Sequence, residues 1–101
     1  MTRLEEVLAD LTTTRSLITY GALARTLNIA PLADLTIRLE TMMAADAGLG
    51  KPLRAALCRA KGPGDLPAPG FFLKAAELGF DVSDPVAFVA LQRAGLFKGC
   101  E

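Results

Sequence analysis

Apolar residues recur at helical spacing over the first eleven positions of the chain. Four of them share one stripe of an α-helix at i, i+3, i+4 and i+7, namely Leu4, Val7, Leu8 and Leu11. Thr2 and Glu5 have the spacing of a capping box at the start of this stripe. The pattern therefore predicts a helix that begins after Thr2 and ends in the hydroxyl-rich run at positions 12–16, where side chains compete for backbone hydrogen bonds.

A short strand, a short helix, a tight turn and a longer helix are predicted next. The composition of Leu17–Tyr20 favours a brief strand, and Thr19 is placed to cap a helix over Gly21–Leu27. Pro31 is typical of the first position of a helix, so a further helix is expected from about Leu32 to Ala45. The residues expected to be buried on it are Leu32, Leu35, Leu39, Met42 and Met43.

Glycine and proline divide the second half of the chain. The partial alternation of Leu53–Ala60 predicts a strand, and the three prolines and three glycines of residues 62–70 predict a turn or extended loop. A helix is expected over Phe71–Leu78, and Ser83–Pro85 opens a last helix that ends at Gly95. The phenylalanines of this half are expected in the core, with some of them available for a dimer surface.

This order of elements is that of a winged helix-turn-helix, in an α+β fold that is mostly α. Leu17–Tyr20 would pair antiparallel with Leu53–Ala60 in a sheet of two or three strands, and positions 62–64 would form the tip of the wing. The prolines that follow favour a truncated wing. The whole chain, 1–101, is expected to be one domain, with a winged-helix core over about 2–61, a loop over 62–70 and two C-terminal helices over 71–98.

Composition narrows the function. The chain is 51% hydrophobic, contains no His and balances 11 basic against 11 acidic residues. Without His there is no Ser-His-Asp or Cys-His pair and no His-ligated metal, so we expect no cofactor and no metal. No apolar run is long enough for a membrane span, and the first residues do not have the pattern of a signal peptide. A cytoplasmic protein is therefore expected.

Basic residues are segregated along the chain although the net charge is zero. Acidic residues are absent from Leu11 to Ala33 and from Ala47 to Gly64. The cations of these two stretches are Arg15, Arg25, Lys51, Arg54, Arg59 and Lys61. Such a local cluster could hold a phosphate backbone, and a solvated strand edge explains the later four cations equally well.

Residues 17–60 resemble the helix-turn-helix part of the O6-alkylguanine-DNA alkyltransferases and the alkyltransferase-like proteins. The resemblance is carried by the run Ile18–Ala24 and by Gly50–Pro52, which is similar to the Gly-Asn-Pro step of that family. It implies duplex-DNA binding, with Tyr20 acting on the DNA backbone. Asp34 or a neighbour stands where the family has a stacking Arg, and no His follows Cys58, so the family's nucleophile motif does not carry over.

Nearly the whole chain is also similar to small uncharacterised bacterial proteins. They share the Ile-Thr-Tyr-Gly step, a step like Gly50–Leu53, and a segment like Leu66–Phe72. This resemblance implies the same fold and a bacterial origin, and no activity.

The first hypothesis is a non-enzymatic winged-helix domain that binds duplex DNA. Its expected contacts are Tyr20, Arg25, Thr36, Arg38, Arg54 and Arg59. The Tyr20 ring could instead cover the edge of the core, and acidic residues on the longer helix favour a merely solvated face.

Two other hypotheses stay open. One is a protein-interaction module or homodimer that keeps the helix-turn-helix shape without binding DNA. The other is a transferase that uses Cys58, against which the expected burial of this thiol and the missing His both weigh.

Overall fold

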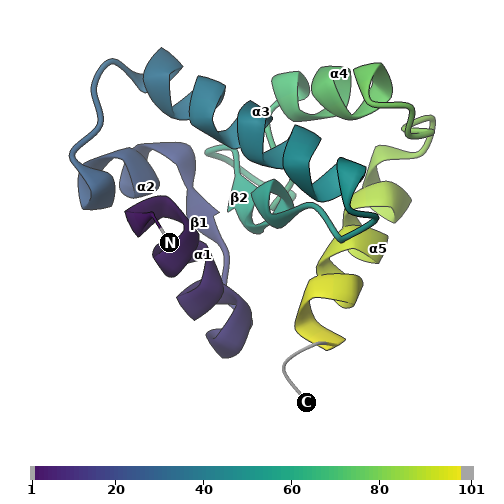
Figure 1. The fold of residues 1–101 in the computed structure, drawn as a ribbon, viewed down its shortest axis with the longest axis horizontal. Helices are drawn as coiled ribbons and strands as arrows, with labels where there is room; N and C mark the ends of the chain where they lie inside the picture. The colour runs from purple at the N-terminus through teal and green to yellow at the C-terminus, as the bar shows by residue number, and fades with distance from the viewer. Residues whose placement is uncertain (1, 99–101) are drawn as a thin grey trace.

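Helices dominate the computed structural model, which describes residues 2–98. Its elements in chain order, with η1 a 3-10 helix, are α1 (Arg3–Thr14), β1 (Ile18–Thr19), α2 (Tyr20–Leu27), α3 (Leu32–Gly48), η1 (Arg54–Leu57), β2 (Cys58–Arg59), α4 (Pro69–Glu77) and α5 (Pro85–Lys98). In Figure 1, α3 crosses the upper part of the molecule, α1 and α2 lie on the left, and α5 descends on the right. The two short strands lie between these groups.

The predicted starts of the first two helices are confirmed. The Thr2 hydroxyl accepts a hydrogen bond from the Glu5 amide at 3.2 Å, and the Glu5 carboxylate accepts one from the Thr2 amide at 3.3 Å, which completes the capping box of α1. Thr19 caps α2, because its hydroxyl accepts the Ala22 amide at 3.2 Å. The stripe of α1 faces the core, where Leu8 is fully buried.

Helix α3 begins at Leu32, as predicted, but it differs from its prediction in the burial of that residue and in where it ends. Leu32 was expected in the core, but that prediction is wrong: its side chain is 50% exposed, because the whole first turn of α3 extends past the core. The helix also continues beyond Ala45 to Gly48. The added turn places Asp46 inside the protein, where its carboxylate is paired as described below. The other residues expected to be buried on α3 are buried, namely Leu35, Leu39, Met42 and Met43.

The predicted antiparallel sheet is wrong. β1 and β2 pair in parallel, with Ile18 opposite Cys58 and Thr19 opposite Arg59. A parallel pair needs a crossover connection, which α2 and α3 supply. The predicted long strand is also wrong over most of Leu53–Ala60: η1 occupies its middle, and residues 53 and 55–58 are all buried instead of alternating.

Among residues 2–98 no third strand forms beside this ladder, so the predicted wing is reduced to a loop. One backbone hydrogen bond closes it, from the Ala60 amide to the Leu66 carbonyl at 2.8 Å. Arg93 of α5 holds the loop from the other side, since its Nη2 donates to the Asp65 carbonyl at 2.7 Å and its Nε to the Ala56 carbonyl at 2.7 Å.

The two C-terminal helices also shift against their predicted bounds. α4 starts at Pro69, before the expected Phe71, because proline fits the first turn of a helix. α5 runs through Gly95, which was predicted to end it. A Cβ at Gly95 would lie 2.9 Å from the Pro52 ring, so this glycine allows a close approach of α5 to the chain before η1. Phe71 and Phe88 are buried as expected.

Candidate functional site

Arg54 is engaged inside the protein. Its Nη2 lies 2.8 Å from Oδ1 of Asp46, whose side chain is 3% exposed, and its Nη1 lies 3.4 Å from Oε2 of Glu5. The Arg54 amide donates to the same Asp46 carboxylate at 3.1 Å. The hydrogen bond to Asp46 raises the pKa of Arg54, which favours the charged pair. Arg54 therefore ties η1 to α3 and α1, and a phosphate would have to compete with two carboxylates for it.

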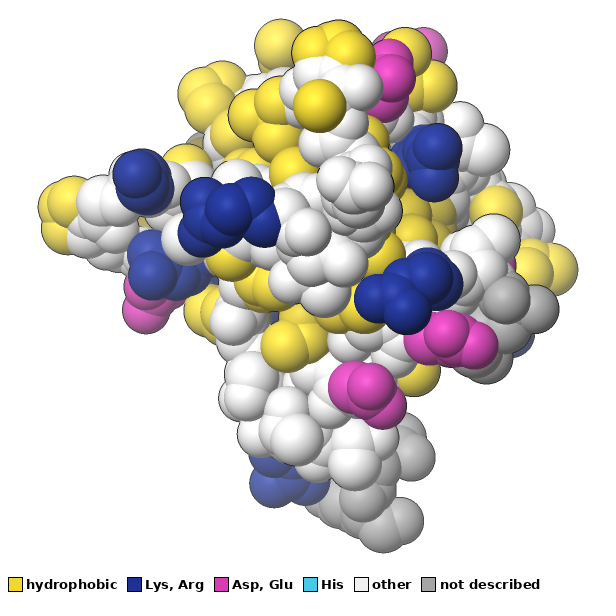
Figure 2. Space-filling model, turned by 90° about the vertical axis from the view of Figure 1, so that its left-hand side faces the viewer, with side chains coloured by type: hydrophobic (Ala, Val, Ile, Leu, Met, Phe, Trp, Pro, Cys, Tyr) yellow, Lys and Arg dark blue, Asp and Glu magenta, His cyan; other side chains and the backbone are white. Residues whose placement is uncertain are grey.

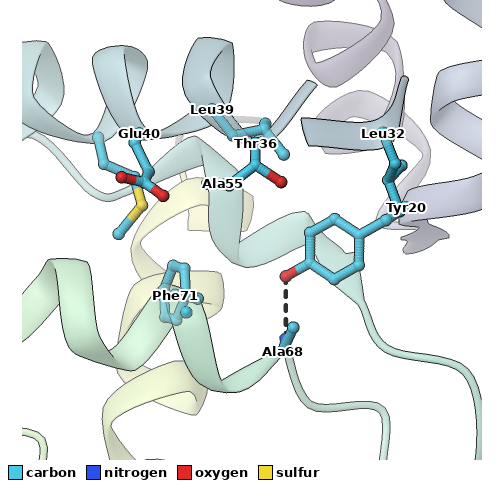
Figure 3. A pocket seen from close by; sticks show the side chains of 10 residues that line it. Tyr20, Leu32, Thr36, Leu39, Glu40, Ala55, Ala68 and Phe71 are labelled. Carbon is cyan, nitrogen blue, oxygen red and sulfur yellow. Dashed lines mark hydrogen bonds between the residues drawn. The ribbon is translucent and has the colours of Figure 1, made fainter. Parts of the chain in front are cut away.

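Tyr20 also faces inward. Its hydroxyl accepts a hydrogen bond from the Ala68 amide at 3.0 Å, just before α4, as the dashed line in Figure 3 marks. Burial raises the pKa of this hydroxyl to about 12. The residue thus connects the start of α2 to the loop in front of α4, and its oxygen is turned toward the protein instead of toward a bound backbone.

Three other predicted contacts are exposed: Arg25 on α2, and Thr36 and Arg38 on α3. Thr36 and Arg38 line separate hollows on the two flanks of α3, so a single flank does not present both. Figure 2 shows the face on which α2 and the start of α3 lie, with several Lys or Arg side chains around exposed hydrophobic ones. Neither Arg25 nor Arg38 has an acidic partner within ion-pair distance among residues 2–98.

Arg59 occupies an intermediate position. It lies on β2, half-buried, with Nε 3.7 Å from Oδ1 of Asp65 in the loop that replaces the wing. The structure therefore separates five of the six predicted contacts into two groups and leaves Arg59 between them. Arg54 and Tyr20 hold the fold together, whereas Arg25, Thr36 and Arg38 reach solvent and Arg59 stands at the rim.

A pocket of about 180 Å³, which no pattern in the sequence predicts, lies between α3 and the start of α4. Its walls are mainly apolar, from Leu39 and Met43 on α3 and Phe71 on α4. Three polar side chains reach it: Tyr20, Thr36 and Glu40 (Figure 3). One wall is formed by Ala68, Gly70 and Phe71, which belong to the segment Leu66–Phe72 that is similar to small bacterial proteins.

Cys58 is fully buried, which confirms the prediction of an enclosed thiol. Burial raises the pKa of this thiol to about 12, against an opposing effect of the positive charge on Arg93. A nucleophile must be ionised and accessible, and Cys58 is neither at neutral pH. The second cysteine, Cys100, lies outside the described residues.

Residues 2–98 contain neither a membrane-spanning helix nor a metal-binding cluster of acidic or thiol side chains. No helix there combines the length and the apolar character that a bilayer crossing requires. No three Asp, Glu or Cys side chains of this part of the chain gather closely enough to hold a metal ion. Comparison of the whole chain with protein-family models, with curated proteins and with solved structures gives no match.

Proposed function

We propose that this domain binds duplex DNA through α2 and the first half of α3, in the manner of a helix-turn-helix. The exposure of α3 carries the proposal. From Leu32 to Arg38 only Leu35 is buried, so the start of α3 has solvent around most of its circumference. A recognition helix needs this exposure to enter a major groove.

Charge on the same elements supports the proposal. On these elements Arg25 and Arg38 are exposed and have no acidic partner among residues 2–98. Arg59 on β2 is a third candidate contact, because its pair with the exposed Asp65 is long, at 3.7 Å. Asp34, exposed in the first turn of α3, keeps phosphates away from that point. Because Arg54 is already paired, we expect about three phosphate contacts, and the interaction is with the backbone more than with base edges.

Salt dependence of DNA binding tests the proposal. With about three phosphate contacts, a plot of log affinity against log salt concentration for a random-sequence duplex has a slope of about −3. Replacing both Arg25 and Arg38 by Ala makes this slope less steep by about 2. The matched control replaces Lys51 and Lys98, two exposed lysines outside α2 and the first half of α3, and leaves the slope unchanged. Absence of binding at low salt rules the proposal out.

A second candidate is association with another copy of the chain. Three large apolar side chains of α4 and α5 are more than half exposed: Leu73 at 73%, Val86 at 63% and Leu91 at 69%. Association with a second copy of the chain would remove such side chains from water. Light scattering across a concentration series measures the mass in solution, and Leu91→Lys returns a dimer formed by this surface to a monomer.

A further inference from the structure

We infer that the pocket between α3 and the start of α4 binds a small organic ammonium ion, a primary amine attached to one ring or a short alkyl group. The size of the pocket sets the size of the ligand. A dry apolar cavity of about 150 Å³ holds one benzene ring, and this pocket measures about 180 Å³. It opens beside Thr36 and Gly70, which are both exposed, so a ligand can enter without unfolding the protein.

The charge of the pocket lining determines the sign of the charge that the ligand should carry. Glu40 is the only charged residue among the described side chains that line the pocket. It is half-buried, and no ion pair or hydrogen bond within residues 2–98 engages its carboxylate. A carboxylate at the edge of an apolar pocket attracts a cation, because the two groups form a charge-assisted hydrogen bond that is partly shielded from water. An anion would face repulsion from the same group.

The number of acceptors fits an ammonium group. An ammonium ion donates three hydrogen bonds and accepts none. The two carboxylate oxygens of Glu40 and the hydroxyl oxygen of Thr36 offer three acceptors on the α3 side of the pocket (Figure 3), while the Tyr20 hydroxyl is engaged by the Ala68 amide. The rings of Tyr20 and Phe71 also line the pocket and can contribute cation–π attraction. The apolar part of the ligand then packs against Leu39 and Met43.

Tyr20 makes the inference directly measurable. It is the only tyrosine of the chain, and there is no tryptophan, so tyrosine fluorescence reports a residue that lines the pocket. The probes are cyclohexylmethylamine, cyclohexylmethanol and cyclohexanecarboxylate, which have similar shapes and absorb no exciting light. We expect the amine to bind with a Kd of about 1 mM or tighter and the alcohol about tenfold more weakly, as loss of a charge-assisted hydrogen bond implies.

Three variants separate the contribution of the Glu40 charge to ligand affinity from the contribution of the space in the pocket. Glu40→Gln lowers the affinity for the amine about tenfold, to that of the alcohol. Asp34→Asn removes the same charge from an exposed position of α3 outside the pocket and leaves the affinity unchanged. Thr36→Leu fills the pocket from its exposed rim and weakens binding of the amine and the alcohol alike. Backbone amide NMR shifts at Gly70 and Phe71 locate the bound probe.

Three outcomes would overturn the inference. Equal affinities for the amine and the alcohol show a pocket that does not select charge. A preference for the carboxylate assigns the site to an anion at the start of α4. No saturable response to any probe, in a protein whose amide spectrum shows it to be folded, removes the ligand site altogether. All measurements are made without DNA, so their failure leaves the proposed DNA binding standing, and the reverse also holds.

Discussion

Arg54 and Asp46 form a two-point contact across the end of α3, with Nη2 2.8 Å from Oδ1 and Nε 3.1 Å from Oδ2. The Asp46 side chain is 3% exposed, whereas the Arg54 side chain is 31% exposed. The burial of the carboxylate is therefore compensated by a partner that itself keeps partial access to water. This pair links the last turns of α3 to the start of η1.

Loss of one member of this pair should destabilise the fold. Asp46→Asn leaves the guanidinium without its principal partner, and we expect a loss of about 2–3 kcal/mol in the free energy of unfolding, below the range for a fully buried pair because Arg54 is partly hydrated. Urea denaturation measures it. Glu5→Gln is the control, with a much smaller loss, since Glu5 lies at 3.4 Å and is more exposed. Equal losses for the two variants would contradict the central role of Asp46.

The thiol of Cys58 should react slowly in the folded protein. In a Cys100→Ser variant, Cys58 is the only thiol left, and its burial together with its raised pKa keeps it protonated and inaccessible at neutral pH. We expect iodoacetamide to label it at least about a hundredfold faster after denaturation. Cys58→Ala should cost about 1 kcal/mol of stability and leave DNA binding unchanged. Rapid labelling of the native protein would support the transferase hypothesis instead.

Stability should fall in alkaline solution. Burial raises the pKa of Cys58 from 9.0 to about 12 and that of Tyr20 from 10.0 to about 12. Both groups are neutral when protonated, so the unfolded chain releases its protons at lower pH than the folded one. Their contribution is fully present below about pH 9 and is lost as the pH rises toward 12.

Urea midpoints measured from pH 8 upward follow this loss. Tyr20→Phe removes the part of the decline that belongs to the phenol, and Cys58→Ala removes the part that belongs to the thiol. If both variants keep the full decline, other groups cause it. At neutral pH, Tyr20→Phe should cost about 1 kcal/mol, because the Ala68 amide loses its acceptor.

Two helical glycines should respond in opposite directions to alanine. Gly48→Ala places a methyl group where no atom lies within 4 Å, and we expect a gain of about 0.5–1 kcal/mol from reduced backbone entropy of the unfolded chain. Gly95→Ala gains the same helix preference but brings its Cβ to 2.9 Å from Pro52 Cγ. The clash should dominate, with a net loss of about 1 kcal/mol. Thermal unfolding of the two variants measures the contrast, and a gain at Gly95 would show that Pro52 yields easily.

The local elements could be predicted because their causes lie close together in the sequence. The capping box of Thr2 and Glu5, the cap at Thr19 and the apolar stripe of α1 all act within four residues. Helix formation depends on contacts at this range. The burial of Cys58 could also be anticipated, because it lies in a run of small and apolar residues.

The candidate site could be predicted only in part. Arg25 and Arg38 reach solvent as a basic contact must. Arg54 lies in an acid-free stretch of the sequence, as Arg25 does, but in the structure it is paired with Asp46 and Glu5. The sequence shows which side chains are charged, but it does not show which of them form ion pairs in the folded protein. The pocket had no local signature, because Tyr20 and Phe71 belong to elements about fifty positions apart.

The sequence by itself determined where most helices form, which of their faces are apolar and which chemistry is absent for want of His. Tertiary structure alone decided the parallel pairing of Ile18 with Cys58, the inward turn of the Tyr20 hydroxyl and the placement of Glu40 beside an apolar pocket. The physical reason is the separation along the sequence between the residues that interact. A helix is stabilised by hydrogen bonds four residues apart, whereas strand direction, ion pairs and cavities depend on which distant segments the folded chain packs against one another.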